Sequence, residues 1–221
     1  MVSPPKNGGA AELLYSTAMR FALAVLLAAS AAAAAVPEKG EGTITLLGGM
    51  RGVVPGNGDY LTEQGASHQL VQPGGLASFG YQYDDDLHFK IEVGYLIDRY
   101  RIAGGDLQVK TVPIMLALDT VLVRGQSVTL YGGGGIGYSL NTGTRQGISN
   151  EANSTAAYLA LGLRFQLAGP VAMVLEDRYT LSTAQVDAQS QRKLTVGGNL
   201  LSFGLMFHFL EPDDKGKPTG R

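Results

Sequence analysis

Residues 87–97 read Leu-His-Phe-Lys-Ile-Glu-Val-Gly-Tyr-Leu-Ile, and this stretch decides the fold class. Its odd positions, from Leu87 to Ile97, are all apolar or aromatic, whereas its even positions include Lys90 and Glu92. A period of two places successive side chains on opposite faces of a β-strand, while a helix would repeat every 3.6 residues. The stretch therefore predicts a strand with one wholly apolar face.

The same alternation returns along most of the chain. It is clear at residues 155–167 and 202–209. Weaker segments with the same period lie at 42–51, 75–83, 108–122, 128–140 and 170–182. These segments together predict eight strands and no helix after about residue 42.

The connections between the predicted strands alternate in length. Those after the second, fourth and sixth strands are short, at 84–86, 124–127 and 168–170. The others are mostly longer and polar, near 52–74, 98–107, 141–153 and 183–198. Short turns on one side and long loops on the other are typical of an antiparallel up-and-down barrel that crosses a membrane. The sequence therefore predicts an all-β, eight-stranded transmembrane β-barrel with both ends on the turn side.

The content of the two strand faces indicates which face is outside. The polar face carries small residues and a few charges of opposite sign, namely Lys90, Glu92, Arg164, Glu176 and Arg178. Only 16% of the chain is charged, and a water-facing surface would hold more. The apolar face is aliphatic, with aromatic residues toward several strand ends, as in the girdles of membrane barrels: Tyr81, Tyr83, Tyr95, Tyr138 and Tyr179. We therefore expect the charges to line the lumen.

Two interpretations of the lumen charges remain open. They could form a gate in a narrow channel, or a salt-bridge network that fills the lumen and holds the barrel shut. The lumen of eight strands is just wide enough for side chains to fill it. Because buried charges must be paired, and these are nearly balanced in sign, we favour the closed network.

The first residues indicate export. Arg20 precedes the apolar run 21–36, which ends in small residues that suit cleavage near Ala35. This pattern is typical of a secretory signal peptide, and a run of about 16 residues is shorter than the ~20 of a spanning helix. We expect an N-terminal extension and signal peptide at 1–35, the barrel at 36–209 and a polar tail at 210–221. Met19 is an alternative start to Met1.

Several motifs carry no chemistry in this context. The chain has no cysteine, and a net charge of −2 without a basic block argues against nucleic-acid binding. Gly132, Gly134 and Gly137 have dinucleotide-motif spacing but lie inside a β-alternating run. The acidic run at 84–86 lacks the other ligands of a calcium loop. The histidines, His68, His88 and His208, have no metal-site spacing. We therefore expect no cofactor, no metal and no enzymatic activity.

Three segments then carry a resemblance: Lys110-Thr-Val-Pro-Ile-Met-Leu116, Leu130-Tyr-Gly-Gly-Gly-Gly-Ile-Gly-Tyr138 and Glu176-Asp-Arg-Tyr179. In order and spacing they resemble the small outer-membrane β-barrel family, which includes the OmpA membrane domain, OmpX and OmpW. The resemblance implies the outer membrane of Gram-negative bacteria, with membrane lipids and lipopolysaccharide as partners and a monomeric barrel. The last strand is similar to the signal read by the barrel-assembly machinery, with Leu205, Phe207 and Phe209 as its residues.

Two features depart from that family. Asp177 has the lipid-facing parity of its strand, where a charge at mid-membrane costs up to a few kcal/mol. We expect it to lie near an interface, or a bulge to shift its register. The tail after Phe209 is too short for the peptidoglycan-binding domain of OmpA-like proteins.

These observations predict an outer-membrane barrel with a charge-plugged lumen and a structural or surface-interaction role. The alternative is a narrow porin, or a conduit for small hydrophobic solutes. Binding would reside in the long first loop, because loops on a rigid scaffold carry most recognition.

Overall fold

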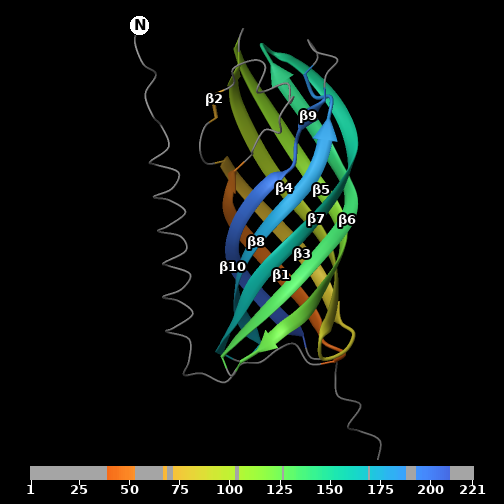
Figure 1. Cartoon of the computed structure of the whole chain (residues 1–221), viewed down its shortest axis with the longest axis vertical. Helices are drawn as coiled ribbons and strands as arrows, with labels where there is room; N and C mark the ends of the chain where they lie inside the picture. Colours follow the sequence, from red (N-terminus) through yellow and green to blue (C-terminus); the bar gives the residue numbers. More distant parts are fainter. Residues whose placement is uncertain are drawn as a thin grey trace, which may run out of the picture.

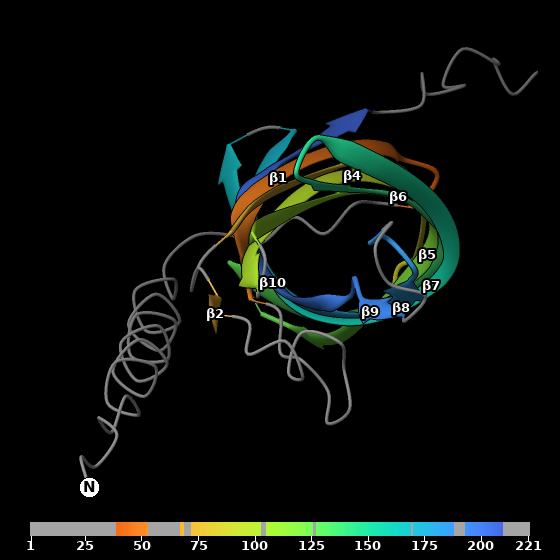
Figure 2. The same cartoon turned by 90° about the horizontal axis from the view of Figure 1, so that it is seen from above.

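A computed structural model describes residues 39–52, 67–68, 72–102, 105–125, 127–168, 170–187 and 193–209. Eight long strands form one closed sheet around a central axis (Figures 1 and 2). They are β1 (Gly42–Gly52), β3 (Gln72–Gln82), β4 (Leu87–Ile102), β5 (Gly105–Arg124), β6 (Val128–Arg145), β7 (Ile148–Ala168), β8 (Val171–Ala184) and β10 (Gly198–Phe209). Two strands of two residues each, β2 (Ser67–His68) and β9 (Leu194–Thr195), lie beside β4 and β8.

The sheet closes because β10 pairs with both β8 and β1. Every pairing between neighbouring strands is antiparallel, and the strands follow one another around the ring in chain order. The predicted eight-stranded up-and-down barrel is confirmed. In the part of the chain that is described, no helix has the length and apolarity to cross a membrane.

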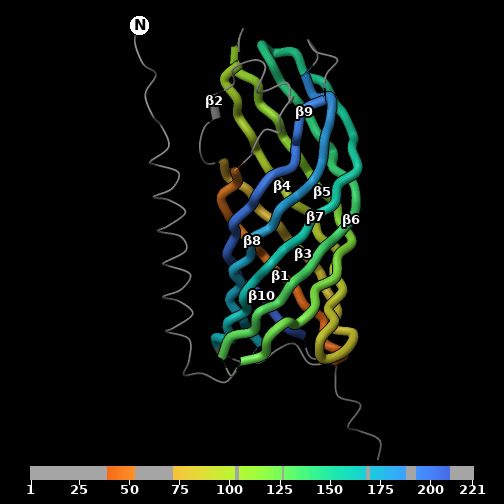
Figure 3. The backbone as a smooth tube through the Cα atoms, viewed as in Figure 1, coloured from red at the N-terminus to blue at the C-terminus, as the bar shows by residue number. Residues whose placement is uncertain are grey.

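The two ends of the barrel differ. The start of β1, the end of β10 and the short connections β3–β4, β5–β6 and β7–β8 share one end, called here the turn end. At the opposite loop end, β4 to β7 extend well beyond β1 (Figure 3). The strands β5, β6 and β7 have 20, 18 and 21 residues, against 11 in β1 and β3.

Two of the predicted long loops are therefore wrong. Strands β4 and β5 continue to Ile102 and from Gly105, and β6 and β7 are joined by Gln146 and Gly147 alone. Both of these residues have positive φ, 52° and 80°, which is the backbone of a type I′ hairpin turn. Polar residues at 98–107 and 141–153 indicated loops, but they belong to strands whose outer face has left the apolar region.

The outer wall carries a continuous apolar surface, called here the apolar band. It consists of the outward positions of 44–50 on β1, 77–81 on β3, 87–97 on β4, 112–122 on β5, 128–140 on β6, 157–167 on β7, 171–181 on β8 and 201–209 on β10. The five predicted girdle tyrosines are all exposed. Because the inner face holds the polar residues, the barrel is built inside out relative to a soluble one.

The sense of the alternation reverses toward the loop end. On β4, the outward residues after Ile97 are Arg99 and Arg101, whereas Tyr100 and Ile102 are buried inside. On β5, Leu107 and Val109 are also buried inside, ahead of the apolar band. The barrel is thus polar inside where its wall is apolar outside, and apolar inside where its wall is polar outside.

Candidate functional site

The candidate site is a cluster of charged side chains that fills the turn-side half of the lumen. Strand alternation directs each of them inward, and they come from β4, β5, β7 and β8. The cluster, called here the lumen network, consists of Lys90, Glu92, Asp119, Arg164, Glu176 and Arg178. These side chains are between 1% and 6% exposed. Three cations therefore face three carboxylates with almost no access to water.

Lys90 is at the centre of the lumen network. Its Nζ lies 3.1 Å from Glu92 Oε1, 3.1 Å from Asp119 Oδ2 and 3.7 Å from Glu176 Oε2. A lysine has three donors in a flexible head, so one ammonium group can serve carboxylates from three strands.

The two arginines complete the pairing. Arg178 Nη2 donates to Glu92 Oε1 at 2.8 Å and to Glu176 Oε1 at 2.7 Å. Arg164 Nη2 donates to Asp119 Oδ2 at 2.8 Å. Charge-assisted hydrogen bonds of this length are the strong class. Each carboxylate therefore contacts at least two cations, and the lumen network has no net charge.

Two tyrosines join the network to the wall. Tyr131 Oη donates to Glu176 at 2.9 Å, and its ring lies under the Arg164 guanidinium, 4.2 Å from ring centre to Cζ. Tyr158 Oη donates to Glu92 at 2.5 Å, with Arg178 at 3.8 Å over its ring. Each tyrosine thus satisfies a carboxylate through its hydroxyl group and a cation through its ring face.

Inward glycines provide the space for these rings. Gly162 pairs directly with Tyr131, and Gly135 with Tyr158, across β6 and β7. A Cβ atom on Gly162 would overlap the Tyr131 ring, and one on Gly135 would press against Tyr158. The glycine-rich stretch of β6 therefore has a steric role in the lumen, and its dinucleotide-like spacing is incidental.

Toward the turn end, a second polar layer continues from the network. His88 Nε2 lies 2.8 Å from Thr43 Oγ1, and its Nδ1 lies 3.6 Å from Asp119 Oδ2. His208 Nδ1 lies 3.5 Å from Glu41 Oε2. His88 and His208 therefore both contact inward-facing neighbours near the turn end.

Toward the loop end, a separate ion pair lies beyond the lumen network. Arg51 Nη1 lies 3.3 Å from Asp98 Oδ2, and Arg51 Nη2 donates to the backbone oxygens of Val196 and Gly197. Leu47, Leu76, Leu96 and Leu200 are buried in one cluster with Tyr131, next to this pair.

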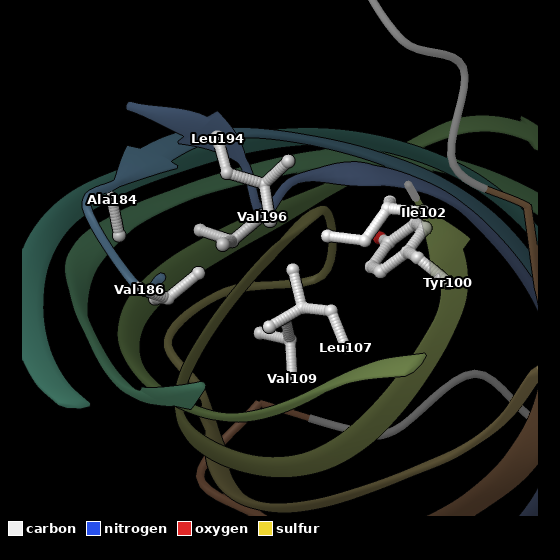
Figure 4. Close-up of a cluster of buried hydrophobic side chains, with 8 residues drawn as sticks. All are labelled: Tyr100, Ile102, Leu107, Val109, Ala184, Val186, Leu194 and Val196. Atoms are coloured by element: carbon white, nitrogen blue, oxygen red, sulfur yellow. The ribbon is translucent and has the colours of Figure 1, made fainter. Parts of the chain in front are cut away.

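Beyond the ion pair, eight buried apolar residues pack together at the loop end (Figure 4). This loop-end cluster consists of Tyr100, Ile102, Leu107, Val109, Ala184, Val186, Leu194 and Val196. The segment between β8 and β10 supplies three of them and folds against β4 and β5 (Figure 4). It is held by Arg145 Nη1, which donates to Asp187 Oδ2 at 2.9 Å, and by Asn150, which donates to the Gln185 carbonyl at 2.8 Å.

Two small cavities lie among the lumen side chains. A cavity of about 10 Å³ adjoins Lys90, Asp119 and Glu176, and another of about 20 Å³ adjoins Arg51 and Arg178. Each has room for about one water molecule.

The structure brings all five sequence-predicted lumen residues into one cluster inside the barrel. It adds Asp119, His88, Tyr131 and Tyr158, which the sequence analysis did not assign to the network. For Asp119 the available signal was its inward parity with Met115 and Ala117 on β5.

The structure also places the remaining sequence candidates. Leu205, Phe207 and Phe209 face outward on the last strand. Asp84 is in the β3–β4 turn, where its Oδ1 accepts from the backbone amides of Asp86 and Leu87. The signal peptide, the tail and most of the first loop lie outside the described residues, and nothing is described of the His68 side chain.

Asp177 faces outward, but neither expected explanation applies. Its pairing is regular, with Leu161 on β7 and Leu201 on β10. The nearest β-bulge on these strands lies between Gln166 and Ala168, at the turn end. The expected register shift is therefore wrong at this position, and the expected interface position is not met either, because exposed Tyr179 and Leu181 continue the apolar band beyond it.

The comparisons with known proteins agree with this architecture. A family model described as "Outer membrane protein beta-barrel domain" matches residues 21–209. Neisserial surface protein A is similar in structure, with a TM-score of 0.55 and 15% identity over 77% of this chain and 98% of that one. OprG from Pseudomonas aeruginosa also has a TM-score of 0.55, with 14% identity over 79% and 98%. At such identities the likeness shows the fold alone. No curated protein matches the sequence.

Proposed function

Because the chain belongs to the outer membrane protein β-barrel domain family, whose members lie in the outer membrane of Gram-negative bacteria, we propose that it is a closed barrel with a structural or surface-interaction role. In such a barrel the turn end faces the periplasm and the loop end faces the exterior. The role is therefore assigned to the wall and the external end, and not to passage through the lumen.

One observation carries this proposal: the lumen network is complete. Three cations and three carboxylates, each at most 6% exposed, are paired with one another across the barrel. Moving one of them aside to open a path would leave an unpaired charge in a dry interior, at a cost of roughly 3–5 kcal/mol. The loop-end cluster adds a second, apolar obstruction between the network and the exterior.

A conduit is the competing proposal, and conductance separates the two. The refolded mature barrel is placed in planar bilayers, and a boiled and an unboiled sample on one gel establish that it is folded. We expect no conductance steps from the folded protein. Reproducible steps that change when Lys90 or Arg178 is replaced by Met would establish a pore through the network and overturn the closed barrel.

An enzymatic role has less support in this geometry. Thr43, His88 and Asp119 lie in the order of a nucleophile, a base and an orienting acid, but they are 0%, 1% and 1% exposed. The cavity that adjoins Asp119 holds about 10 Å³, so a substrate has no room to approach the hydroxyl group. We propose that the three residues pack the lumen.

The external rim fits lipopolysaccharide as a lipid partner. Arg99, Arg101 and Lys110 are exposed on the outer face of β4 and β5, directly beyond the apolar band, with Tyr95 just inside it. Cations at this level face the phosphates of the outer leaflet. We expect the unfolding temperature in lipopolysaccharide vesicles to exceed that in phosphatidylcholine vesicles, and Lys110→Glu to reduce this difference. An unchanged difference would remove the rim from the proposal.

A further inference from the structure

A single carboxylate interrupts the apolar band. Asp177 is exposed on β8, with Leu161 and Leu201 on either side and Leu175 and Tyr179 before and after it on the same face. Among the described outward positions of the apolar band, it is the only charged residue. It has no hydrogen-bond or ion-pair partner within the described part of the chain, and its neighbour Arg178 points into the lumen.

A carboxylate that stays ionised at this position is stabilised by a counter-ion, because an unpaired charge is costly on a lipid-facing surface and in an apolar medium. The cations of the outer wall lie beyond the band, as at Arg99 and Lys110, or in the turn at Arg124. A second copy of this chain at the same depth would therefore present another Asp177, and not a cation. The counter-ion has to come from a different molecule.

An apolar groove runs along the outer wall and ends on β8 at Tyr179 and Leu181, and Asp177 is the next outward residue of β8 beyond Tyr179. The groove has a volume of about 870 Å³ and crosses from β3 to β8 between two rows of outward side chains. The row nearer Asp177 consists of Tyr81, Phe89, Leu118, Gly134, Leu159 and Tyr179. The floor between the two rows includes the inward-facing positions Ala117 and Gly135. Its volume is in the range of small-molecule sites.

The β8 end of the groove brings an aromatic ring and a carboxylate together. Tyr179 belongs to the groove and is two residues from Asp177 on the same face of β8. An organic cation is attracted both by an aromatic face and by a carboxylate, and both attractions strengthen out of water.

We propose that this groove binds a lipophilic organic cation from the membrane, with its apolar body along the groove and its ammonium group beside Asp177 and Tyr179. The carboxylate then orients a ligand whose body lies against the outward apolar and aromatic side chains of the groove. Lys90 also lines the groove, but its ammonium group is paired with carboxylates in the lumen. This inference does not depend on whether the lumen conducts.

The test uses a rod-shaped fluorescent cation, trimethylammonium-diphenylhexatriene, and its neutral parent diphenylhexatriene. Saturable binding is measured by fluorescence anisotropy in nanodiscs that hold one folded barrel, with empty nanodiscs as the blank. We expect the cation to bind saturably, and Asp177→Asn to weaken that binding about tenfold, the loss of one desolvated ion pair. The neutral probe should be unaffected by Asp177→Asn.

Two further variants keep the test specific. Ala157→Phe places a ring in the groove from an outward position, so it should weaken both probes. Asp106→Asn removes an exposed carboxylate at the loop end and should change neither. Equal binding of the cation to wild type and Asp177→Asn would overturn the proposal in favour of lipid chains alone. A change in oligomeric state with Asp177→Asn, read by native mass spectrometry, would overturn it in favour of a protein partner.

Discussion

The two halves of the lumen contain opposite kinds of side chain. The turn-side half is filled by the lumen network, in which six charged side chains are paired. The loop-side half is filled by the loop-end cluster, in which eight apolar side chains pack together. The wall explains the difference: around the network it faces the apolar band, and around the cluster it carries Arg99, Arg101 and Lys110.

The difference between the two halves reflects the two surroundings of the barrel wall, lipid and water. In the membrane, lipid contacts the apolar outer face, and the polar groups pair with one another inside the barrel. Beyond it, water takes the polar face and the hydrophobic effect fills the interior, as in a soluble barrel. On β4 the apolar residues move from the outward face to the inward face between Ile97 and Arg99. This exchange of faces marks the membrane boundary.

The largest expected effect breaks the polar half. Arg178→Met leaves Glu92 and Glu176 with only Lys90 as a cation, so an excess negative charge is buried. We expect the free energy of unfolding, measured with urea in lipid vesicles, to fall by roughly 3–5 kcal/mol. Arg99→Met, an exposed arginine, is the matched control and should change it by less than about 0.5 kcal/mol. Equal effects of the two variants would mean that the lumen network is hydrated.

The polar half is also where sequence reasoning was most informative. Lys90, Glu92, Arg164, Glu176 and Arg178 alternate with large apolar residues, so parity alone assigns them to the lumen. Asp119 was not predicted to belong to the lumen network, because the inward face of β5 also carries the apolar residues Leu107, Val109 and Met115. On this strand the polar and apolar faces are therefore not distinct in the sequence. Tyr131 and Tyr158 could be placed only from the register that sets each ring opposite a glycine.

The apolar half was less predictable for a physical reason. A strand is recognised from the sequence by one face that stays apolar along its length. At the membrane boundary the apolar residues change from the outward face to the inward face. Residues 98–107 therefore read as a polar loop, although they continue β4 and begin β5. Pairing with β5 over this stretch extends from Asp98↔Val109 to Ile102↔Gly105, and only long-range structure shows it.

The next effect tests the apolar half. Leu107 is fully buried in the loop-end cluster, and Leu107→Ala should leave a cavity that costs about 2–3 kcal/mol. Because the cluster lies beyond the apolar band, we expect the loss to appear as local opening. Amide hydrogen exchange at Val186, Leu194 and Val196 should speed up, while the urea midpoint of the barrel changes little. A midpoint shift as large as that of Arg178→Met would show that the two halves unfold as one unit.

The smallest effect sharpens the comparison inside the polar half, where charge pairing also depends on shape. A Cβ on Gly162 would overlap the Tyr131 ring, which donates to Glu176 and lies under Arg164. Gly162→Ala adds one methyl group to a filled interior, so it should cost about 1–2 kcal/mol by urea unfolding. Gly48→Ala is the matched control, because Gly48 is on the outer face with no atom within 4 Å of the added Cβ. Removing the hydroxyl group in Gly162→Ala/Tyr131→Phe should not restore stability, because the phenylalanine ring still overlaps the added Cβ and the hydrogen bond to Glu176 is also lost. Recovery of stability in that double variant would show that the added methyl group clashes with the hydroxyl group of Tyr131 and not with its ring. Gly162 would then be needed for the hydrogen bond to Glu176 and not for the packing of the ring.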